Sequence, residues 1–230
     1  MNRLFLTGDT HQSIDIHKLS SSKFKIGNEL TKDDVLIIAG DAGFVWNYGK
    51  SAKGEEKYWR NWINNRSWTT FCVCGNHENY DLINEFPIVD FFGGKARKIT
   101  DSLYYEIRGE VYNINGRKIL TCGGADSTDK EFRKEGVSWW TKERISSEDY
   151  KNALKNLEKY NFNIDYIITH TGGTEICSSI GFNSTISDIY IDQIIKLINF
   201  KRHYCGHYHI DKSLLDIKSR IIYDDIIELM

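Results

Sequence analysis

Short hydrophobic runs that stop at glycine or at a polar residue recur along this chain. Three lie in its first third: RLFLTGD (3–9), DDVLIIAGDAG (33–43) and TTFCVCGNHE (69–78). Runs with little polar alternation are typical of strands that are buried on both faces of a sheet. We therefore expect three buried strands here, each followed at once by polar residues.

A helix is expected between the second and third of these strands. In the segment 54–65, Tyr58, Trp59, Trp62 and Ile63 recur at helical spacing, which gives the segment one apolar face. A strand, a helix and a second strand of these lengths are typical of a βαβ unit, whose crossover is expected to be right-handed. The beginning of the chain therefore predicts an α/β fold.

The middle of the chain has a different pattern. Asn115-Gly116 lies between two β-rich runs in the segment 102–124, and this dipeptide is a strong signal for a hairpin turn. The segment 125–145 shows little periodicity and predicts a long functional loop. Residues 146–161 predict a helix, with Ser147 as its N-cap.

The last third returns to strands and helices. IDYIITH (164–170) and RHYCGHYHI (202–210) predict buried strands, and SDIYIDQIIKLINF (187–200) predicts a helix between them. The segment 213–229 predicts a closing β-hairpin. With one proline, no low-complexity stretch and no internal repeat, the pattern favours a single α/β domain over residues 1–230.

Composition narrows the class of protein. Lys+Arg 30 against Asp+Glu 32 gives a net charge of -2, which gives no bulk electrostatic case for wrapping nucleic acid. No apolar run approaches the ~18 to 20 residues that span a bilayer, and the N-terminal apolar segment is too short for a signal peptide. The five cysteines are odd in number, which favours reduced core thiols. We expect a cytoplasmic protein without a membrane partner.

Polar side chains collect where the predicted strands end. Ligands in open α/β folds bind at the carboxyl ends of strands, so we expect these side chains to meet at one rim. The small residues before them let the backbone turn sharply. Five blocks have this form: Gly8-Asp9-Thr10-His11, Gly40-Asp41, Gly75-Asn76-His77-Glu78, Thr169-His170 and Gly206-His207-Tyr208-His209.

The residue types indicate what this rim binds. They offer oxygen and imidazole ligands and no thiolate, a set that suits borderline-hard divalent ions such as Mn, Fe or Zn. Seven ligands are too many for one tetrahedral zinc, but they fit two ions about 3.5 to 4 Å apart that share a carboxylate. The seven are Asp9, His11, Asp41, Asn76, His170, His207 and His209.

The same blocks resemble the motifs of the calcineurin-like metallophosphoesterase family. They run in the order of that family and extend over nearly the whole chain. The resemblance implies a four-layer α/β/β/α fold, in which two mixed sheets form a sandwich flanked by helices. It also implies a metal-dependent phosphoric ester hydrolase with a binuclear centre.

The resemblance assigns a role to each matching residue. Asp9, His11 and His209 would hold one ion, Asn76, His170 and His207 the other, and Asp41 would bridge them. His77 would be the catalytic histidine that assists the leaving group, while a hydroxide shared by the ions attacks phosphorus. We expect manganese first, with iron, zinc or nickel as alternatives. Cys205 would lie one step deeper in its strand, and we interpret it as core packing.

Departures from the family pattern concern the substrate. Gln12 stands where the family commonly has glycine, and GDAGF (40–44) lacks the Asp-Arg-Gly continuation of the protein Ser/Thr phosphatases. The fourth block, THTGG (169–173), is a loose match to the usual histidine-glycine pair. These changes leave the metal set intact. Together with the aromatic loop, they favour a phosphodiesterase acting on a nucleotide or another small phosphodiester over a phosphomonoesterase or a protein phosphatase.

Two rivals of other kinds are a non-catalytic interaction scaffold with the same fold and a nuclease. The complete ligand set with His77 argues against the scaffold. The near-neutral net charge argues against the nuclease.

The long loop is the expected source of substrate contacts. Arg133 would be a bidentate phosphate clamp, Trp139 and Trp140 stacking surfaces, and Asp126 a further contact. The alternative is that the tryptophans cap the core and Arg133 lies at the surface.

Glu78, the last residue of the third block, and three residues outside the blocks remain to be interpreted. Glu78 and Asp81 are candidates to orient His77. His17 and His203 fall outside the blocks, and we expect them to be surface or structural histidines.

Overall fold

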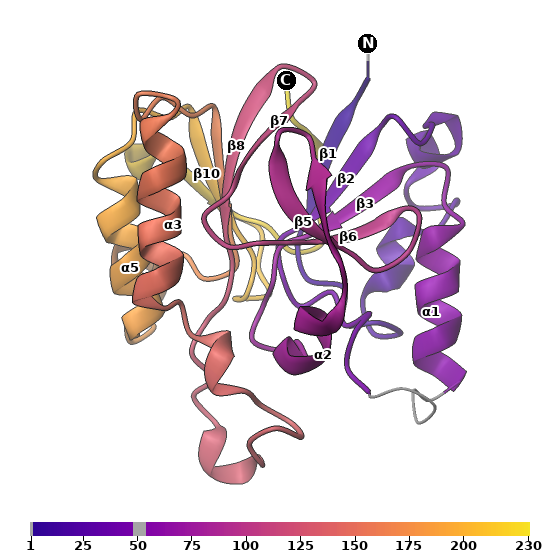
Figure 1. The fold of residues 1–230 in the computed structure, drawn as a ribbon, viewed down its shortest axis with the longest axis horizontal. Helices are drawn as coiled ribbons and strands as arrows, with labels where there is room; N and C mark the ends of the chain where they lie inside the picture. The colour runs from indigo at the N-terminus through magenta and orange to yellow at the C-terminus, as the bar shows by residue number, and fades with distance from the viewer. Residues whose placement is uncertain (1, 48–53) are drawn as a thin grey trace.

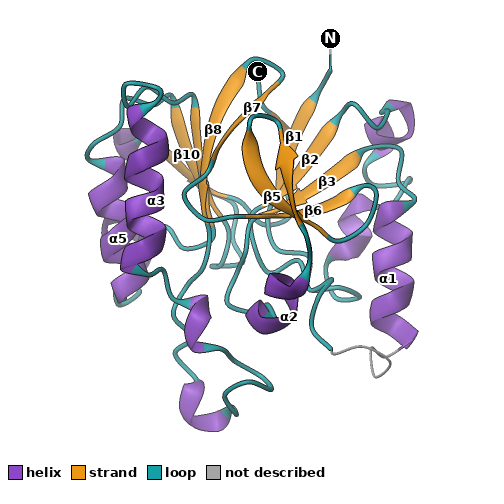
Figure 2. Cartoon of the chain, in the orientation of Figure 1, coloured by secondary structure: helices purple, strands orange, loops and turns teal. Residues whose placement is uncertain are grey.

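Two mixed β-sheets pack face to face, and helices cover their outer faces (Figure 1). The computed structural model describes residues 2–47 and 54–230. Figure 2 shows the strands in the middle of the molecule, with α3 and α5 on one side and α1 on the other. This arrangement confirms the predicted sandwich of two sheets flanked by helices.

The larger sheet joins the amino-terminal strands to the last strand. β1, β2, β3 and β6 run parallel; β13 is antiparallel to β1, and β5 is antiparallel to both β6 and β4. In spatial order its seven strands are β13 (Ile226–Glu228), β1 (Leu4–Thr7), β2 (Val35–Ile38), β3 (Thr69–Cys72), β6 (Leu103–Glu106), β5 (Gly94–Lys98) and β4 (Ile88–Phe91).

The smaller sheet comes from the second half of the chain. β8, β9, β10 and β12 run parallel, and β7 and β11 lie antiparallel at the two edges. In spatial order its six strands are β11 (Lys212–Leu214), β12 (Ser219–Ile221), β10 (Arg202–Cys205), β9 (Tyr166–Thr169), β8 (Arg117–Cys122) and β7 (Val111–Ile114).

Successive residues of the central strands belong to different cores. In β1, Leu4 and Leu6 face the space between the sheets, whereas Phe5 faces the helical layer. In β9, Ile168 lies between the sheets and Ile167 packs toward α3 and α5. Each fully buried side chain of this kind contributes about 1.5 to 3 kcal/mol by leaving water. The unbroken hydrophobic runs of the sequence thus reflect burial on both faces of each strand.

The helices flank both sheets. α1 connects β2 to the parallel β3, as the βαβ pattern predicts, and buries Trp59 and Ile63; Tyr58 was expected on that face but is 58% exposed. α3 begins after Ser146 and not after Ser147, because the Ser146 hydroxyl accepts from the Asp149 amide while the Asp149 carboxylate accepts from the Ser146 amide. The helices are α1 (Gly54–Asn64), α2 (Tyr80–Glu85), α3 (Ser147–Glu158), α4 (Thr174–Ile180) and α5 (Ile186–Ile195).

The predicted hairpins are only partly correct. The turn at Asn115-Gly116 connects β7 to β8 as expected, and both residues have positive φ (55° and 80°). The β-rich run before it contains two strands, β6 and β7, which belong to different sheets. The closing hairpin 213–229 is also divided: β11 and β12 pair with each other, whereas β13 leaves them and pairs with β1. Local pattern does not reveal such long-range partners.

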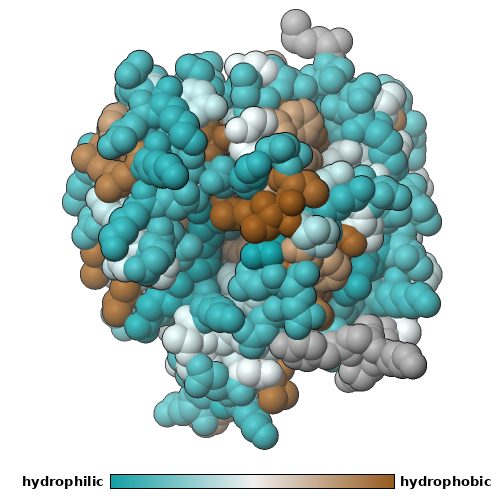
Figure 3. Space-filling model, viewed as in Figure 1, coloured by the Kyte–Doolittle hydropathy of each residue, from teal (hydrophilic) through white to brown (hydrophobic). Residues whose placement is uncertain are grey.

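The face of the molecule seen in Figure 3 is mainly hydrophilic. An apolar patch lies near β5 in this view. In the described part of the chain, none of the helices has both the length and the hydropathy needed to traverse a bilayer. All five cysteines are buried and unpaired, which confirms the prediction of core thiols.

His203 is a buried structural histidine in β10. Its Nε2 lies 2.8 Å from the hydroxyl of Thr169 in β9, and its Nδ1 lies 3.3 Å from the hydroxyl of Ser219 in β12. Because Thr169 donates its own proton to the Thr171 carbonyl at 2.6 Å, it accepts from Nε2–H of His203. Burial lowers the pKa of His203 to about 3.

This histidine predicts a loss of stability in mild acid. The unfolded chain binds a proton at His203 below about pH 6.5, whereas the folded protein does so only near pH 3. The stability contributed by His203 is therefore complete above about pH 6.5 and falls with decreasing pH, by about 2 kcal/mol between pH 7 and pH 5. Urea unfolding of metal-free protein at the two pH values should show a drop that is smaller by this amount in His203→Gln. Exposed His17 provides the control: His17→Gln should keep the full drop, and an equal drop in both variants would contradict the assignment.

Candidate metal centre

The predicted blocks converge where the strands of both sheets end. β1, β2 and β3 of the larger sheet and β9 and β10 of the smaller sheet each deliver polar residues within a few positions of their carboxyl ends. These residues are Asp9 and His11, Asp41, Asn76 and His77, His170, and His207 and His209. The seam between the sheets therefore brings together side chains that lie up to 200 positions apart.

Several of these residues have a strained backbone. Four of them have a positive φ, in the left-handed region that residues other than glycine rarely adopt. The values are 37° for His11, 47° for Asp41, 71° for His207 and 53° for His209. Such conformations cost about 1 to 3 kcal/mol each and cluster at functional sites. At Gly206 the reason for glycine is direct: a Cβ there would lie 2.3 Å from Oδ1 of Asp9. The turn that carries His207 is therefore packed against the Asp9 carboxylate.

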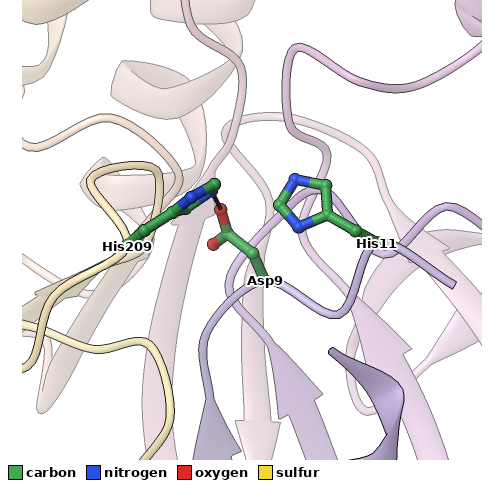
Figure 4. A group of neighbouring side chains, drawn as sticks. All are labelled: Asp9, His11 and His209. Atoms are coloured by element: carbon green, nitrogen blue, oxygen red, sulfur yellow. Dashed lines mark ion pairs between the residues drawn. The ribbon is translucent and has the colours of Figure 1, made fainter. Parts of the chain in front are cut away.

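Asp9, His11 and His209 form the first group of candidate ligands (Figure 4). Their ligand atoms lie within 4.8 Å of one another, with Asp9 between the two imidazoles. Oδ2 of Asp9 is 3.2 Å from Nε2 of His209, yet it is buried and accepts no hydrogen bond of good geometry. An unsatisfied buried carboxylate oxygen is costly, and a cation would satisfy it. The donors of this group therefore fit a divalent ion.

Asp9, Asp41 and His170 form the second group. Oδ1 of Asn76 lies 3.1 Å from Nε2 of His170, and the ring of His207 lies 4.9 Å from the ring of His170. Oδ2 of Asp41 is 3.4 Å from Nε2 of His170 and 3.3 Å from Nε2 of His11. Asp41, a member of the second group, thus also faces His11 of the first group.

Each central imidazole is oriented by a contact on its outer nitrogen. Nδ1 of His170 donates to the Ala39 carbonyl at 2.9 Å, and Nδ1 of His11 donates to the Asp15 carboxylate at 2.9 Å. These contacts leave both Nε2 atoms facing Asp41, the tautomer that metal-binding histidines require. Asn76 is held in a similar way, because its Nδ2 donates to the Ser127 hydroxyl at 3.2 Å.

The site separates charge strongly. Burial opposes ionisation of Asp9 and Asp41, but the imidazoles around them hold the pKa of both carboxyls below the usual range. Burial likewise opposes protonation of His11 and His170, yet Asp41 raises the pKa of each to about 9. The carboxylates therefore remain ionised and available to a cation despite complete burial.

His77 lies beside this cluster, with its ring centroid 5.7 Å from that of His11. Its backbone amide donates to Oδ1 of Asp41 at 2.7 Å, its ring stacks on Trp46 at 6.4 Å and 25°, and its Nε2 lies 3.3 Å from Nη2 of Arg133. Burial, with a contribution from the Arg133 cation, lowers the pKa of His77. Trp46 has no signal in the sequence beyond its place after the second block.

Arg133 extends from the long loop to the site. Its Nε donates to the Asp129 carboxylate at 2.8 Å and its Nη1 to the Ser138 carbonyl at 3.4 Å. With His77, Asn76 and His207 it lines a pocket of about 270 Å³. The loop that carries Arg133 projects below the sheets in Figure 1.

The other three residues of the loop that were expected to contact substrate, Asp126, Trp139 and Trp140, have partners of their own within the protein. Asp126 lines the same pocket, but its carboxylate pairs with Arg144 and accepts from Ser187 of α5. Trp140 is buried and packs edge-on against Trp46 at 5.1 Å, one layer behind His77, while Trp139 lies under the Lys130 ammonium at 4.8 Å.

The structure does not bring the carboxylates of Glu78 and Asp81 to the His77 ring. Glu78 is buried and accepts from the Ala42 amide at 2.9 Å and the Tyr105 hydroxyl at 3.2 Å. Asp81 pairs with Lys142 at 2.6 Å. Cys205 is fully buried at the end of β10 and packs in the core, as expected, and His17 is exposed.

Asp15 and Tyr223 were missed by sequence reasoning. Asp15 follows His11 by four residues, a spacing that brings two side chains together in a helical turn, whereas nothing in the local sequence distinguishes Tyr223. The Tyr223 ring stacks on His209, and its hydroxyl donates to Asp15.

Two kinds of comparison with known proteins give matches, one by sequence and one by structure. A family model described as Calcineurin-like phosphoesterase matches residues 3–211. Among solved structures, GAP50, the anchor in the inner membrane complex of Plasmodium, matches with a TM-score of 0.54 and 14% identity, over 97% of this chain and 71% of that chain. Sulfate thiohydrolase SoxB of Thermus thermophilus matches with a TM-score of 0.44 and 12% identity, over 97% and 51%. No curated protein is significantly similar in sequence.

Proposed function

Because this chain belongs to the calcineurin-like phosphoesterase family, we propose that it hydrolyses phosphate esters at a binuclear metal centre. The observation that carries the proposal is the pair of Asp/His groups that share the buried Asp9, one of them with His11 and His209 and the other with Asp41 and His170. Residues 1–230 would form one catalytic domain. The five unpaired cysteines suit a reducing compartment such as the cytoplasm.

Each ion would have its own set of ligands. Asp9, His11 and His209 would hold one, Asn76, His170 and His207 the other, and Asp41 would contact both. The distances of 3.3 and 3.4 Å from Oδ2 of Asp41 to His11 and His170 support this bridging role. Oxygen and imidazole donors without thiolate favour manganese, with iron, zinc or nickel as alternatives.

The residues around the centre have separate tasks in hydrolysis. Two bound divalent ions would supply a water of lowered pKa and neutralise charge on the phosphate. Arg133 would bind a phosphate oxygen through the guanidinium that lies 3.3 Å from His77. His77 would assist the departing oxygen with a proton or a hydrogen bond. Trp46 and Trp140 form an apolar wall behind His77.

We propose a small phosphodiester, such as a nucleotide diester, as the substrate class. The pocket beside His77 and His207 extends to Phe182 and Tyr208, so it offers aromatic surface for the second ester group. Bis-p-nitrophenyl phosphate and p-nitrophenyl phosphate, each assayed with Mn²⁺, test this order. A higher kcat/KM for the diester supports the proposal, and a higher value for the monoester assigns a phosphatase. Metal-loaded protein that hydrolyses neither ester, nor any member of a broader panel, would indicate a non-catalytic scaffold.

Arg133→Ala should raise KM or lower kcat, with an expected loss in kcat/KM of about tenfold to a hundredfold, because charge-assisted hydrogen bonds contribute about 1.5 to 3 kcal/mol. Metal content, measured by elemental analysis, should stay unchanged because Arg133 contacts none of the proposed ligands. Lys134→Ala removes the adjacent exposed cation of the same loop and is the matched control. Unaltered kinetics in Arg133→Ala would disprove the phosphate contact.

A further inference from the structure

Tyr223 lies in the connection between β12 and β13, outside the 3–211 segment that matches the family model. Its ring stacks on the ring of His209, with centroids 4.8 Å apart and planes 16° apart. The His209 side chain is 50% exposed, so it has fewer packing neighbours than the buried Asp9. The Tyr223 face is therefore a strong restraint on the orientation of this imidazole.

The hydroxyl of Tyr223 is linked through Asp15 to His11, the other histidine of the first group. It donates to Oδ1 of Asp15 at 2.8 Å, and Oδ2 of Asp15 accepts from Nδ1 of His11 at 2.9 Å. The Tyr223 side chain thus stacks directly on His209, and it is linked to His11 indirectly, by hydrogen bonds through Asp15. Two of the ligands proposed for the other ion are oriented separately, His170 by the Ala39 carbonyl and Asn76 by the Ser127 hydroxyl.

Tyr223 is itself held firmly in place. Its amide donates to Oδ1 of Asp211 at 2.9 Å, and a Cβ at Gly8 would lie 2.1 Å from the Ile222 carbonyl oxygen, so the two backbones are in close contact. The buried Lys18 ammonium donates to the Tyr223 carbonyl and, at 2.7 Å, to the Asp9 carbonyl. These contacts fix Tyr223 relative to the backbone of Asp9.

We propose that Tyr223 is a positioning residue that preorganises the Asp9, His11 and His209 group, and only this group, for its ion. The inference rests on the proposed binuclear centre. A partner that orients a metal-binding histidine contributes about tenfold to a hundredfold in metal affinity. Since Tyr223 acts on one group, its loss lowers the affinity for one ion and leaves the affinity for the other unchanged.

The test is a calorimetric titration of metal-free protein with Mn²⁺. Tyr223→Phe retains the ring and removes only the bond to Asp15, so one of the two dissociation constants rises about tenfold and the other is unchanged. Asp15→Ala raises the dissociation constant of the same ion by at least as much. In the Asp15→Ala background, Tyr223→Phe causes no further rise in that constant. Saturating Mn²⁺ restores hydrolysis by Tyr223→Phe, which a general folding defect would prevent.

Tyr166→Phe is the matched control, because the Tyr166 hydroxyl also holds the end of the chain, through the Met230 carbonyl, but does not contact the site. This variant keeps both affinities. The inference is overturned if Tyr223→Phe titrates like the original protein, or if both ions weaken equally. A protein that binds no Mn²⁺ at all refutes the proposed function and, with it, this inference, whereas two ions bound equally well by Tyr223→Phe refute the inference alone.

Discussion

Replacement of Asp41 by asparagine should release both ions and lower kcat/KM by at least about 10³-fold, or roughly 4 kcal/mol of transition-state stabilisation. Oδ2 of Asp41 lies 3.3 Å from Nε2 of His11 and 3.4 Å from Nε2 of His170, so its negative charge would serve both halves of the centre. Asparagine keeps the shape of the side chain and can still accept from the His77 amide at Oδ1. The substitution thus removes charge with little change in packing.

Elemental analysis after gel filtration, with activity measured in parallel, checks this expectation. Asp33→Asn, at the exposed and opposite end of β2, is the control and should retain both ions. Circular dichroism should show that Asp41→Asn remains folded. Two ions retained per chain in Asp41→Asn would contradict the bridging role.

Replacement of His77 by glutamine should leave both ions bound and lower turnover by about 10²- to 10⁴-fold. The amide of His77 donates to Oδ1 of Asp41, and a substitution retains that amide. The ring, which stacks on Trp46 beside Arg133, is the part that the departing oxygen would meet. Loss of the ring should therefore affect the chemical step more than metal binding.

The dependence on the leaving group makes this test specific. Assistance to a departing oxygen matters most for poor leaving groups, so an alkyl ester should lose more activity in His77→Gln than a nitrophenyl ester. An equal loss for both esters would contradict the proposed role, as would full activity with both ions retained. His17→Gln, a change to an exposed histidine, should leave both reactions unchanged.

The strand-end blocks were readable in the sequence because each joins two strong signals. A hydrophobic run fixes where a strand lies, and a small residue followed by Asp, His or Asn marks its carboxyl end. In the structure, Asp9, Asp41 and His170 do lie within ligand distance of one another. The two-layer core was equally readable, since residues such as Phe5 and Leu6 must both be buried in the same strand.

What sequence reasoning missed depends on contacts between distant segments. The partner of β13 is β1, more than 200 positions earlier, and a local hairpin pattern cannot show this. Tyr223 has no neighbouring motif, because its role comes from where β12 and β13 place it. Trp140 was open between core and substrate contact, and its burial against Trp46 is set by the loop as a whole.

The pairing of β13 with β1 affects how the chain can fold while it is being synthesised. β1 leaves the ribosome more than 200 residues before β13, yet Arg3 and Glu228 pair across them at 2.5 Å. Until β13 appears, one edge of β1 has no partner, and an open edge can pair with another chain. Tyr223 emerges just before β13. The segment that covers this edge of β1 would therefore also supply the tyrosine proposed to position His11 and His209.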